Sequence, residues 1–236
     1  MVIAIVGAGG KTTVGSHIGK QLAALGRRVL FTTTTKIFMP ESEAVYLGDA
    51  ADVRSEADYM VAAQKLLPNG KLQGYTPEDI QSIAASGLFD DIIVEADGAA
   101  RKPVKAPGDM EPVYPAALDL IIGVAGLDSL GKPVSENHVH RPELFRAVTG
   151  AAENEPIAAR HIVRLISHPD GLFRYAPEGV PKVVFLNKCD TMDETAKQQA
   201  DETIRQSPYP VLLTGYVREW FGEFRRRFAG QQSKGE

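Results

Sequence analysis

The sequence predicts an α/β fold in which a mostly parallel β-sheet carries helices on both faces. Short runs of aliphatic, often β-branched residues recur along the 236 residues, and "VIAIV" at 2–6 is the first of them. Runs of this kind are typical of strands buried on both faces. Segments with the 3.6-residue apolar spacing of helices lie between the runs. This alternation predicts that ligands bind at the carboxyl ends of the strands.

The first strand, loop, helix and strand form a recognisable unit. After "VIAIV", apolar residues recur at helical spacing at Val14, Ile18 and Leu22, and the helix is expected to end near Gly26. "RVLFTTTT" at 28–35 then predicts the second strand. The whole is a β-α-β unit of about thirty residues, whose threonines lie at the carboxyl end of the second strand.

The remaining elements follow the same alternation. Further strands are expected at 91–98, 119–126, 182–188 and 210–215, and helices at 140–148, 157–166 and 191–206. Patterns are weaker before residue 88, where we expect a strand at "AVYLG", a helix over 53–67, and a helix in "TPEDIQSIAASG" with Thr76 as N-cap and Pro77 in its first turn. The sequence predicts one P-loop-like α/β domain over 1–229 and a disordered tail at 230–236.

Composition excludes several classes of protein. The 26 basic and 30 acidic residues give a formal net charge of -4, which argues against a dedicated nucleic-acid binder. The one cysteine excludes an internal disulfide framework and suits a reducing compartment. No apolar run approaches the roughly 20 residues that span a bilayer, and no basic leader precedes the first strand. We therefore expect a cytoplasmic protein without a membrane segment.

The segment "GAGGKTT" at 7–13 has the composition of a phosphate-binding loop. Glycines at 7, 9 and 10 allow backbone N–H groups to surround an anion. Lys11 is then expected to reach the β- and γ-phosphates and the Thr12 hydroxyl to bind Mg²⁺. The nucleotide-binding residues expected in this loop are Gly7, Gly9, Gly10, Lys11, Thr12 and Thr13.

The match to G-x-x-x-x-G-K-[ST] is partial. Counting five residues back from Gly10 reaches Ile5 instead of a glycine. The shorter spacing also resembles the G-x-x-G-K-T-T loop of the Mur ligases. The alternative is a plain glycine turn with Lys11 on the surface, and the loop alone does not choose the reaction.

Two carboxylates end the strand in "IIVEADGAA". Glu95 and Asp97 lie on the same side of that strand, where Asp97 is expected to hold Mg²⁺ and Glu95 to orient an attacking water. Alternatively one of them caps a turn and the other forms an ion pair. A buried carboxylate pair needs a cation in either case.

"RKPVKAP" follows at once, with three basic residues that either bind phosphate or an anionic substrate or are solvated: Arg101, Lys102 and Lys105. Arg101 joins Lys11, Glu95 and Asp97 as an expected catalytic residue.

"LNKCD" ends another apolar strand and contains N-K-x-D. Asp190 is expected to accept hydrogen bonds from N1–H and the exocyclic amine of guanine, which adenine cannot donate in that arrangement. The stem of Lys188 is expected to cover the base, and Asn187 to tie this loop to the phosphate loop. An Asn/Asp turn is the alternative, because the D-x-x-G of guanine-specific GTPases is absent. GTP is thus favoured, and ATP remains open.

Two further groups of polar residues are weaker indications of a binding site. Thr34 and Thr35, at the tip of the second strand, either contact Mg²⁺ and the γ-phosphate or reflect β-propensity alone. His138 and His140 have a spacing that suits a metal on a strand, but no third ligand is nearby. A polar loop before a helix is the favoured interpretation of the histidines.

Taken together, the motifs resemble the YqeC family, which is described as selenium-dependent hydroxylase accessory proteins. The segments that carry the resemblance span nearly the whole chain: "GAGGKTT", "TTTTK" followed by Pro40, "VEADGAARKPVKAPGDMEPVYP", "GLDSLGKPV" with "HRPELF", and "LNKCD". The resemblance implies a nucleotide-dependent step in the maturation of selenium-dependent molybdenum hydroxylases, with a hydroxylase or its cofactor-assembly proteins as partner. It also implies that Glu111, Pro112 and Asp128 line the same cleft.

Three functions follow from these expectations. The favoured one is a Mg²⁺-dependent nucleoside triphosphatase with GTP as its expected substrate. Hydrolysis is expected to move the loops at 34–40 and 98–112. The second is an ATP-dependent ligase or kinase acting on a small acid or an oxyanion, bound by the basic residues after Asp97. The third is a non-catalytic module that uses nucleotide to order a docking surface.

Overall fold

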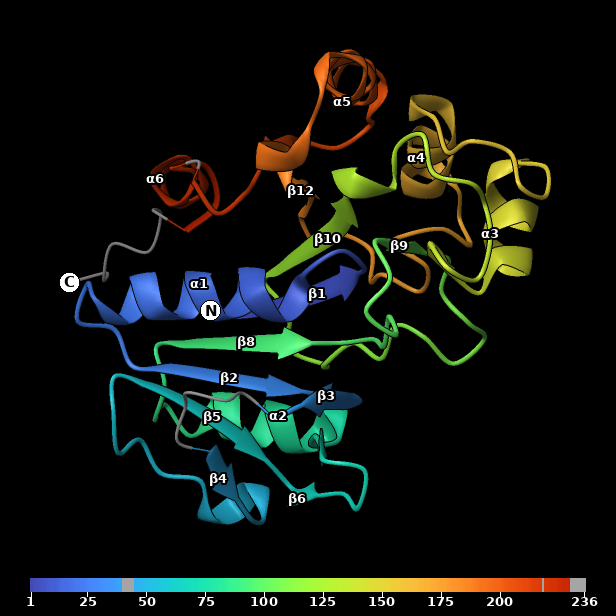
Figure 1. The fold of residues 1–236 in the computed structure, drawn as a ribbon. Helices are drawn as coiled ribbons and strands as arrows, with labels where there is room; N and C mark the ends of the chain where they lie inside the picture. Colours follow the sequence, from blue (N-terminus) through green and yellow to red (C-terminus); the bar gives the residue numbers. More distant parts are fainter. Residues whose placement is uncertain (40–44, 218, 230–236) are drawn as a thin grey trace.

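An eight-stranded, wholly parallel sheet forms the centre of the computed structural model, which describes residues 1–39, 45–217 and 219–229 (Figure 1). The spatial order of its strands is β13-β12-β10-β1-β8-β2-β5-β4. Their bounds are β1 (Val2–Gly7), β2 (Val29–Thr33), β4 (Val45–Leu47), β5 (Tyr59–Ala63), β8 (Asp91–Glu95), β10 (Leu120–Gly126), β12 (Lys182–Asn187) and β13 (Val211–Leu213). The predicted α/β class and parallel sheet are confirmed.

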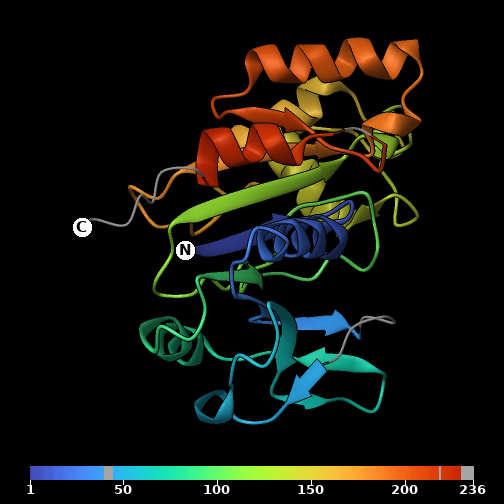
Figure 2. The ribbon, with the colours of Figure 1, turned by 90° about the vertical axis from the view of Figure 1, so that its left-hand side faces the viewer.

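Helices cover both faces of this sheet (Figures 1 and 2). One face packs against α1 (Lys11–Ala23) and α6 (Phe221–Phe224), and the other against α2 (Pro77–Ala85), α3 (Pro142–Thr149), α4 (Ala159–Ser167) and α5 (Glu194–Gln206). Strand β1 shows why two layers form. Ile3 and Ile5 lie in the apolar cluster beneath α1, whereas Ala4 and Val6 lie in the cluster beneath α3 and α4.

Two small sheets lie beyond the carboxyl ends of the central strands. β3 (Lys36–Phe38), β7 (Lys71–Gln73) and β6 (Lys65–Leu66) form an antiparallel sheet in that order, directly after β2. β9 (Val104–Lys105) pairs in parallel with β11 (Val139–His140). The short helical turns are η1 (Ala50–Asp52), η2 (Leu127–Ser129), η3 (Cys189–Thr191) and the π-helical η4 (Arg225–Ala229). Neither small sheet is predicted by the sequence pattern.

The predicted helix over 53–67 is wrong. Tyr59–Ala63 is strand β5, which pairs with β2 on one side and with β4 on the other. A five-residue apolar run fits a buried strand or a helix segment equally by periodicity, and here the free strand edge of β2 decides the outcome. The predicted tail at 230–236 and Pro40 lie outside the described residues.

The helix at "TPEDIQSIAASG" forms with the predicted N-cap. Thr76 Oγ1 accepts from the N–H of Asp79 at 3.1 Å, and Asp79 Oδ2 accepts from the N–H of Thr76 at 3.0 Å. This is a reciprocal capping box, with Pro77 in the first turn.

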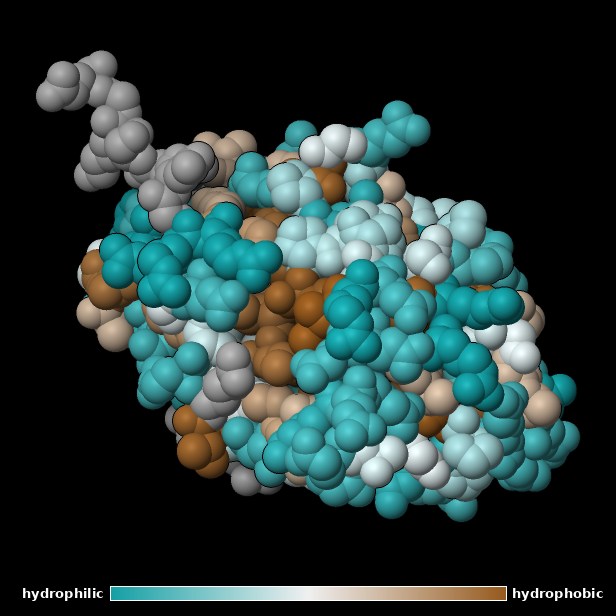
Figure 3. All heavy atoms as spheres, turned by 90° about the horizontal axis from the view of Figure 1, so that it is seen from above, coloured by the Kyte–Doolittle hydropathy of each residue, from teal (hydrophilic) through white to brown (hydrophobic). Residues whose placement is uncertain are grey.

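The surface on the side of α5 and α6 is mostly hydrophilic, with a hydrophobic area near its centre and smaller ones toward its edges (Figure 3). None of the helices in the described part of the chain combines the length and the apolar character needed to cross a membrane.

The predicted motifs lie together at one edge of the sheet, at the carboxyl ends of the neighbouring strands β12, β10, β1 and β8. In the parallel register, Ile5 on β1 lies beside Glu95 on β8, and Gly126 on β10 lies beside Asn187 on β12. The glycine loop after β1, the acidic residues after β8 and the N-K-x-D segment after β12 therefore meet, as expected at the ligand-binding edge of an open parallel sheet.

Candidate functional site

The loop between β1 and α1 depends on glycine at two positions. Gly9 and Gly10 have φ angles of 89° and 118°, which are left-handed values that L side chains rarely adopt. A Cβ at Gly9 would stand 2.3 Å from the backbone nitrogen of Gly126, and one at Gly10 would stand 2.5 Å from Asn187 Nδ2. Close approach of neighbouring segments, as well as conformation, therefore requires both glycines.

The protein itself uses two of the loop amides that were expected to bind an anion. Gly7 N–H donates to Asp97 Oδ2 at 2.9 Å, and Gly9 N–H donates to the carbonyl of Lys102 at 3.1 Å. The role expected for these two amides is therefore corrected to a structural one. The first amides of α1, those of Lys11, Thr12 and Thr13, have no intrahelical acceptor because of their position, and they are the ones suited to an anion.

Lys11 is buried, so the alternative of a surface lysine is wrong. Its side chain is 3% exposed, and Nζ lies 2.8 Å from the carbonyl of Gly7, 3.1 Å from Asp97 Oδ1 and 3.5 Å from Glu95 Oε1. Burial favours the neutral amine, but the two carboxylates together outweigh it and raise the pKa of Lys11. The ammonium is thus the cation that the predicted carboxylate pair requires.

The two carboxylates differ in their surroundings. Glu95 is buried, which raises its pKa, and the nearby charge of Asp97 raises it further against the opposing effects of Lys11 and Thr12. Thr12 Oγ1 donates to Glu95 Oε2 at 2.7 Å. Asp97 Oδ1 is buried and, among the described residues, has no hydrogen-bond donor of good geometry, although Lys11 Nζ lies nearby. An oxygen of this kind, which shares Lys11 with a second carboxylate, fits a hard cation such as Mg²⁺.

A second buried lysine holds Asp97 from the other side. Lys105 Nζ lies 2.9 Å from Asp97 Oδ2 and donates to Glu111 Oε2 at 2.8 Å, and Arg141 also donates to Glu111 Oε2 at 2.7 Å. Burial opposes ionisation of Glu111, but Arg141 and Lys105 outweigh it and lower its pKa to about 2. Lys105 is therefore committed to ion pairs, which corrects the expectation that it binds a ligand or is solvated.

The other basic residues of "RKPVKAP" also have partners. The guanidinium of Arg101 lies over the Phe38 ring at 4.1 Å from its centroid, and Lys102 Nζ donates to the carbonyl of Asn137 at 3.2 Å. Arg101 nevertheless lines the hollow in front of the phosphate loop, so its expected contact with a ligand stays a prediction.

The N-K-x-D segment is joined to the phosphate loop, as expected for Asn187. Asn187 Nδ2 donates to the carbonyl of Gly9 at 2.8 Å, and Thr214 Oγ1 donates to Asn187 Oδ1 at 2.9 Å. Lys188 Nζ pairs with Asp128 Oδ2 at 2.7 Å. Asp190 Oδ2 accepts from the backbone N–H groups of Tyr216 and Val217. These contacts fix the loop after β13 beside the phosphate loop, and guanine recognition by Asp190 stays a prediction.

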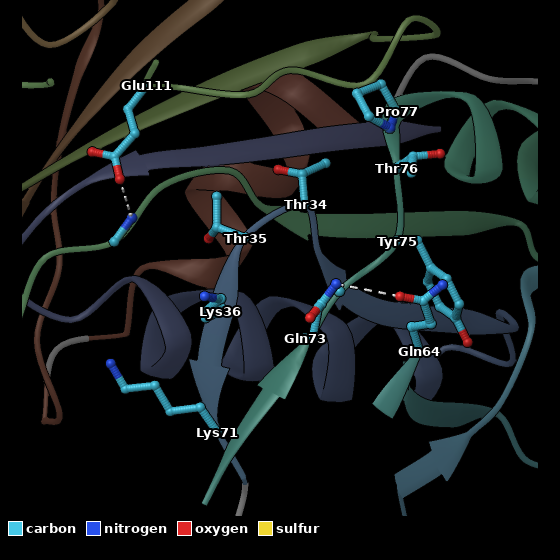
Figure 4. A pocket seen from close by; sticks show the side chains of 12 residues that line it. Thr34, Thr35, Lys36, Gln64, Lys71, Gln73, Tyr75, Thr76, Pro77 and Glu111 are labelled. Atoms are coloured by element: carbon cyan, nitrogen blue, oxygen red, sulfur yellow. Dashed lines mark hydrogen bonds between the residues drawn. The ribbon is translucent and has the colours of Figure 1, made fainter. Parts of the chain in front are cut away.

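Two adjoining hollows open at this edge of the sheet. One, of about 310 Å³, is lined by residues 9–13, by Glu95, by residues 98–102 and by Lys36, Ile37, Phe38, Lys71, Lys188 and Tyr216. The other, of about 590 Å³, contains Thr34, Thr35 and Glu111 and shares Lys36, Lys71 and Gly98 with the first (Figure 4). Among the described residues, Asp190 lines neither of these two hollows.

The threonine tip thus belongs to the larger hollow. Thr34 Oγ1 donates to the carbonyl of Val113 at 2.7 Å, and the hydroxyls of Thr33 and Thr35 lie 3.2 Å apart. In the described ranges, no group of three or more His, Cys, Asp or Glu side chains is arranged to hold a metal ion. The polar-loop interpretation of His138 and His140 stays a prediction. Sequence reasoning missed Lys36, Phe38, Lys71 and Tyr216, because their positions depend on the unpredicted β3–β7 pairing and on the loop after β13.

Comparison with known proteins identifies the family. The family described as "YqeC protein" matches residues 3–143 of the chain. The YqeC protein of Escherichia coli (strain K12), described as an uncharacterized protein, is 34% identical over 226 residues, which cover 92% of this chain and 88% of that protein. The chain belongs to the YqeC family. Among solved structures, the MinC:MinD cell division protein complex of Aquifex aeolicus contains a chain with a TM-score of 0.48 at 16% identity, covering 89% of this chain and 78% of the other.

The charge cluster of this YqeC chain predicts a specific acid sensitivity. The pKa of Glu111 is about 2 in the folded state against an ordinary 4.5, so its ion pairs stabilise the fold above about pH 4.5, and this stabilisation is lost as the pH falls toward 2. Glu111→Gln should therefore have a lower urea midpoint than the wild type at pH 6 and a smaller decrease in midpoint between pH 6 and pH 3.

Glu143→Gln removes an exposed carboxylate at the start of α3 and serves as the matched control. Its urea midpoints should follow those of the wild type at both pH values. Equal pH dependence of the wild type and Glu111→Gln would show that Glu111 is not held ionised by Lys105 and Arg141.

Proposed function

We propose that this YqeC-family protein binds a purine nucleoside triphosphate with Mg²⁺ in the 310 Å³ hollow and hydrolyses it. The observation that carries the proposal is the placement of Lys11 and Thr12. Both stand at the N-terminus of a 13-residue helix, after a glycine loop. Lys11 contacts both buried carboxylates, Glu95 and Asp97, and Thr12 donates to Glu95. Helix amides, an ammonium, a hydroxyl and carboxylates are together the groups that phosphoryl transfer needs for positioning and charge stabilisation.

Each residue has a role in this proposal. The amides of Lys11 to Thr13 and the Lys11 ammonium bind the phosphates, and Thr12 and Asp97 hold the metal. Bound Mg²⁺ would neutralise the charge on the phosphate oxygens. Glu95 orients the attacking water. Because burial raises the pKa of Glu95, its carboxylate is suited to accept a proton from that water. Arg101, at the rim of the hollow, contributes further positive charge.

The preference for GTP rests on the segment after β12. The Lys188 stem and Tyr216 line the hollow, and Asn187 joins this wall to Gly9 of the phosphate loop. In this proposal the carboxylate of Asp190 selects guanine when the loop after β13 closes on the base.

Membership of the YqeC family supports a further step of the proposal. Nucleotide turnover would serve the maturation of selenium-dependent molybdenum hydroxylases, with movement of the loops after β2 and β8 signalling the nucleotide state to a hydroxylase or a cofactor-assembly protein. Phosphate release without any added acceptor would exclude the ligase or kinase alternative. Nucleotide-dependent retention of a hydroxylase subunit without turnover would favour the docking-module alternative.

Removing the Lys11 ammonium should abolish most nucleotide affinity. Calorimetric titration with non-hydrolysable GTP and ATP analogues plus Mg²⁺ should show binding of the GTP analogue to the wild type. Lys11→Ala should weaken it by about 10- to 150-fold, the equivalent of about 1.5–3 kcal/mol for a charged hydrogen bond. Lys65→Ala, an exposed lysine on β6, is the matched control and should bind like the wild type.

Thermal melts should accompany this titration, because Lys11→Ala leaves Glu95 and Asp97 without their ammonium partner. Thr12→Ala, which keeps that ammonium, provides a second variant. If the folded wild type binds neither analogue, or if Lys11→Ala binds as well as the wild type, the proposed function is wrong.

Asp190→Asn should change which base is preferred. Guanine donates a hydrogen bond from its C2 amine, whereas the C2 oxygen of xanthine accepts one, so the asparagine amide should weaken GTP and favour xanthosine triphosphate. The Asn oxygen can still accept from the N–H groups of Tyr216 and Val217, which preserves the loop. Competition titration of the two nucleotides measures the preference, and equal losses for both would mean that Asp190 only supports the loop.

A further inference from the structure

The larger hollow beside the phosphate loop has the size of a ligand site. Its volume of about 590 Å³ lies within the 300–1,000 Å³ typical of small-molecule pockets. It lies between the antiparallel sheet β3-β7-β6, the N-terminus of α2 and the segment around Glu111 (Figure 4). In the proposed function the nucleotide occupies the 310 Å³ hollow, and no part of it is assigned to the larger one.

The charge on its wall favours an anion. Lys36 and Lys71 lie on the neighbouring strands β3 and β7, and both line the hollow. In the register of these strands, Lys36 lies opposite Gln73 and Lys71 lies opposite Phe38. Within the described residues neither lysine has a carboxylate partner, although Lys71 Nζ lies over the Phe38 ring at 4.8 Å from its centroid. Glu111, the one carboxylate that the described part of the chain places on the wall, is already paired with Lys105 and Arg141. Among the described residues, the two ammonium groups are therefore the uncompensated charge of this hollow.

Neutral polar groups on the wall add hydrogen-bonding capacity. Gln73 Nε2 and Gln64 Oε1 are 3.4 Å apart, a long hydrogen bond that a ligand can replace (Figure 4). Each side-chain amide offers both a donor and an acceptor, and the hydroxyls of Thr35 and Thr76 lie on the same wall. Such a wall suits a molecule with polar substituents in addition to its negative charge.

The position of the lysines connects this space with the phosphate loop. The two hollows share three lining residues, Lys36, Lys71 and Gly98. A ligand in the larger hollow would therefore lie beside a nucleotide bound in the smaller one. Under the ligase or kinase alternative, an anionic acceptor is expected at Arg101, Lys102 and Lys105. Lys105 is buried among carboxylates and Lys102 bonds to a carbonyl, so the basic residues available at the second space come from β3 and β7 instead.

We propose that the 590 Å³ hollow binds a second small molecule, a polar carboxylate- or phosphate-bearing metabolite, through Lys36 and Lys71. This inference rests on the proposed function only for the statement that the molecule lies beside a bound nucleotide. The anion-binding character of the hollow rests instead on Lys36 and Lys71 and on the amides of Gln64 and Gln73.

The test follows backbone amides in ¹H–¹⁵N spectra of the full chain during titration with inorganic phosphate and with malate. A non-hydrolysable GTP analogue with Mg²⁺ saturates the phosphate loop first, and the titration is repeated with Lys11→Ala without nucleotide. Saturable shifts are expected at residues 34–36 and 71–76 in both samples. Lys36→Gln combined with Lys71→Gln should weaken binding about tenfold, whereas Lys65→Gln, a charge loss on the adjacent β6, should leave it unchanged.

The outcomes distinguish the two claims. If the wild type fails to bind nucleotide while phosphate or malate still shifts residues 34–36 and 71–76, the proposed function fails and the second site stands. If neither probe gives saturable shifts there, or if the double variant binds like the wild type, the second site is overturned. Shifts confined to residues 9–13 would also overturn it, because they would place the anion at the phosphate loop alone.

Discussion

The buried ammonium of Lys11, held between Asp97 and Glu95, is the interaction on which the site depends. Isolated charges in a protein interior are costly, so these groups are retained only because they compensate one another. Lys11 comes from the start of α1 and the carboxylates come from the end of β8, so their contact fixes the loop against the neighbouring strand. The same contact keeps a cation where the phosphates of a nucleotide would compete for it.

A chain of opposite charges extends this centre into the protein. Asp97 also pairs with Lys105, Lys105 with Glu111, and Glu111 with Arg141 just before α3. Asp97 and Glu111 therefore share the ammonium of Lys105, and Lys105 and Arg141 share the carboxylate of Glu111. Glu111 also lines the larger hollow, so the charge chain joins the cluster of Lys11, Glu95 and Asp97 to the wall of that hollow.

The parts predicted from the sequence are those that depend on local pattern. The run "VIAIV", the glycine loop and the capping box at Thr76 each contain their own structural reason. The carboxyl-end placement of Glu95, Asp97 and Asn187 follows from a general property of parallel sheets. The burial of Lys105 and the donation of Gly7 N–H to Asp97 depend on contacts between distant segments, which periodicity does not encode. The β3–β7 pairing that creates the second space was missed for the same reason.

The most direct test of this account is whether a divalent cation binds at Asp97 together with a nucleotide. Electron paramagnetic resonance of Mn²⁺ in place of Mg²⁺ measures the bound fraction with and without a non-hydrolysable GTP analogue. Tight Mn²⁺ binding is expected only with the nucleotide, weakened about 10- to 100-fold by Asp97→Asn and unchanged by Asp201→Asn on the exposed side of α5. Mn²⁺ binding that ignores the nucleotide, or that survives Asp97→Asn intact, would contradict it.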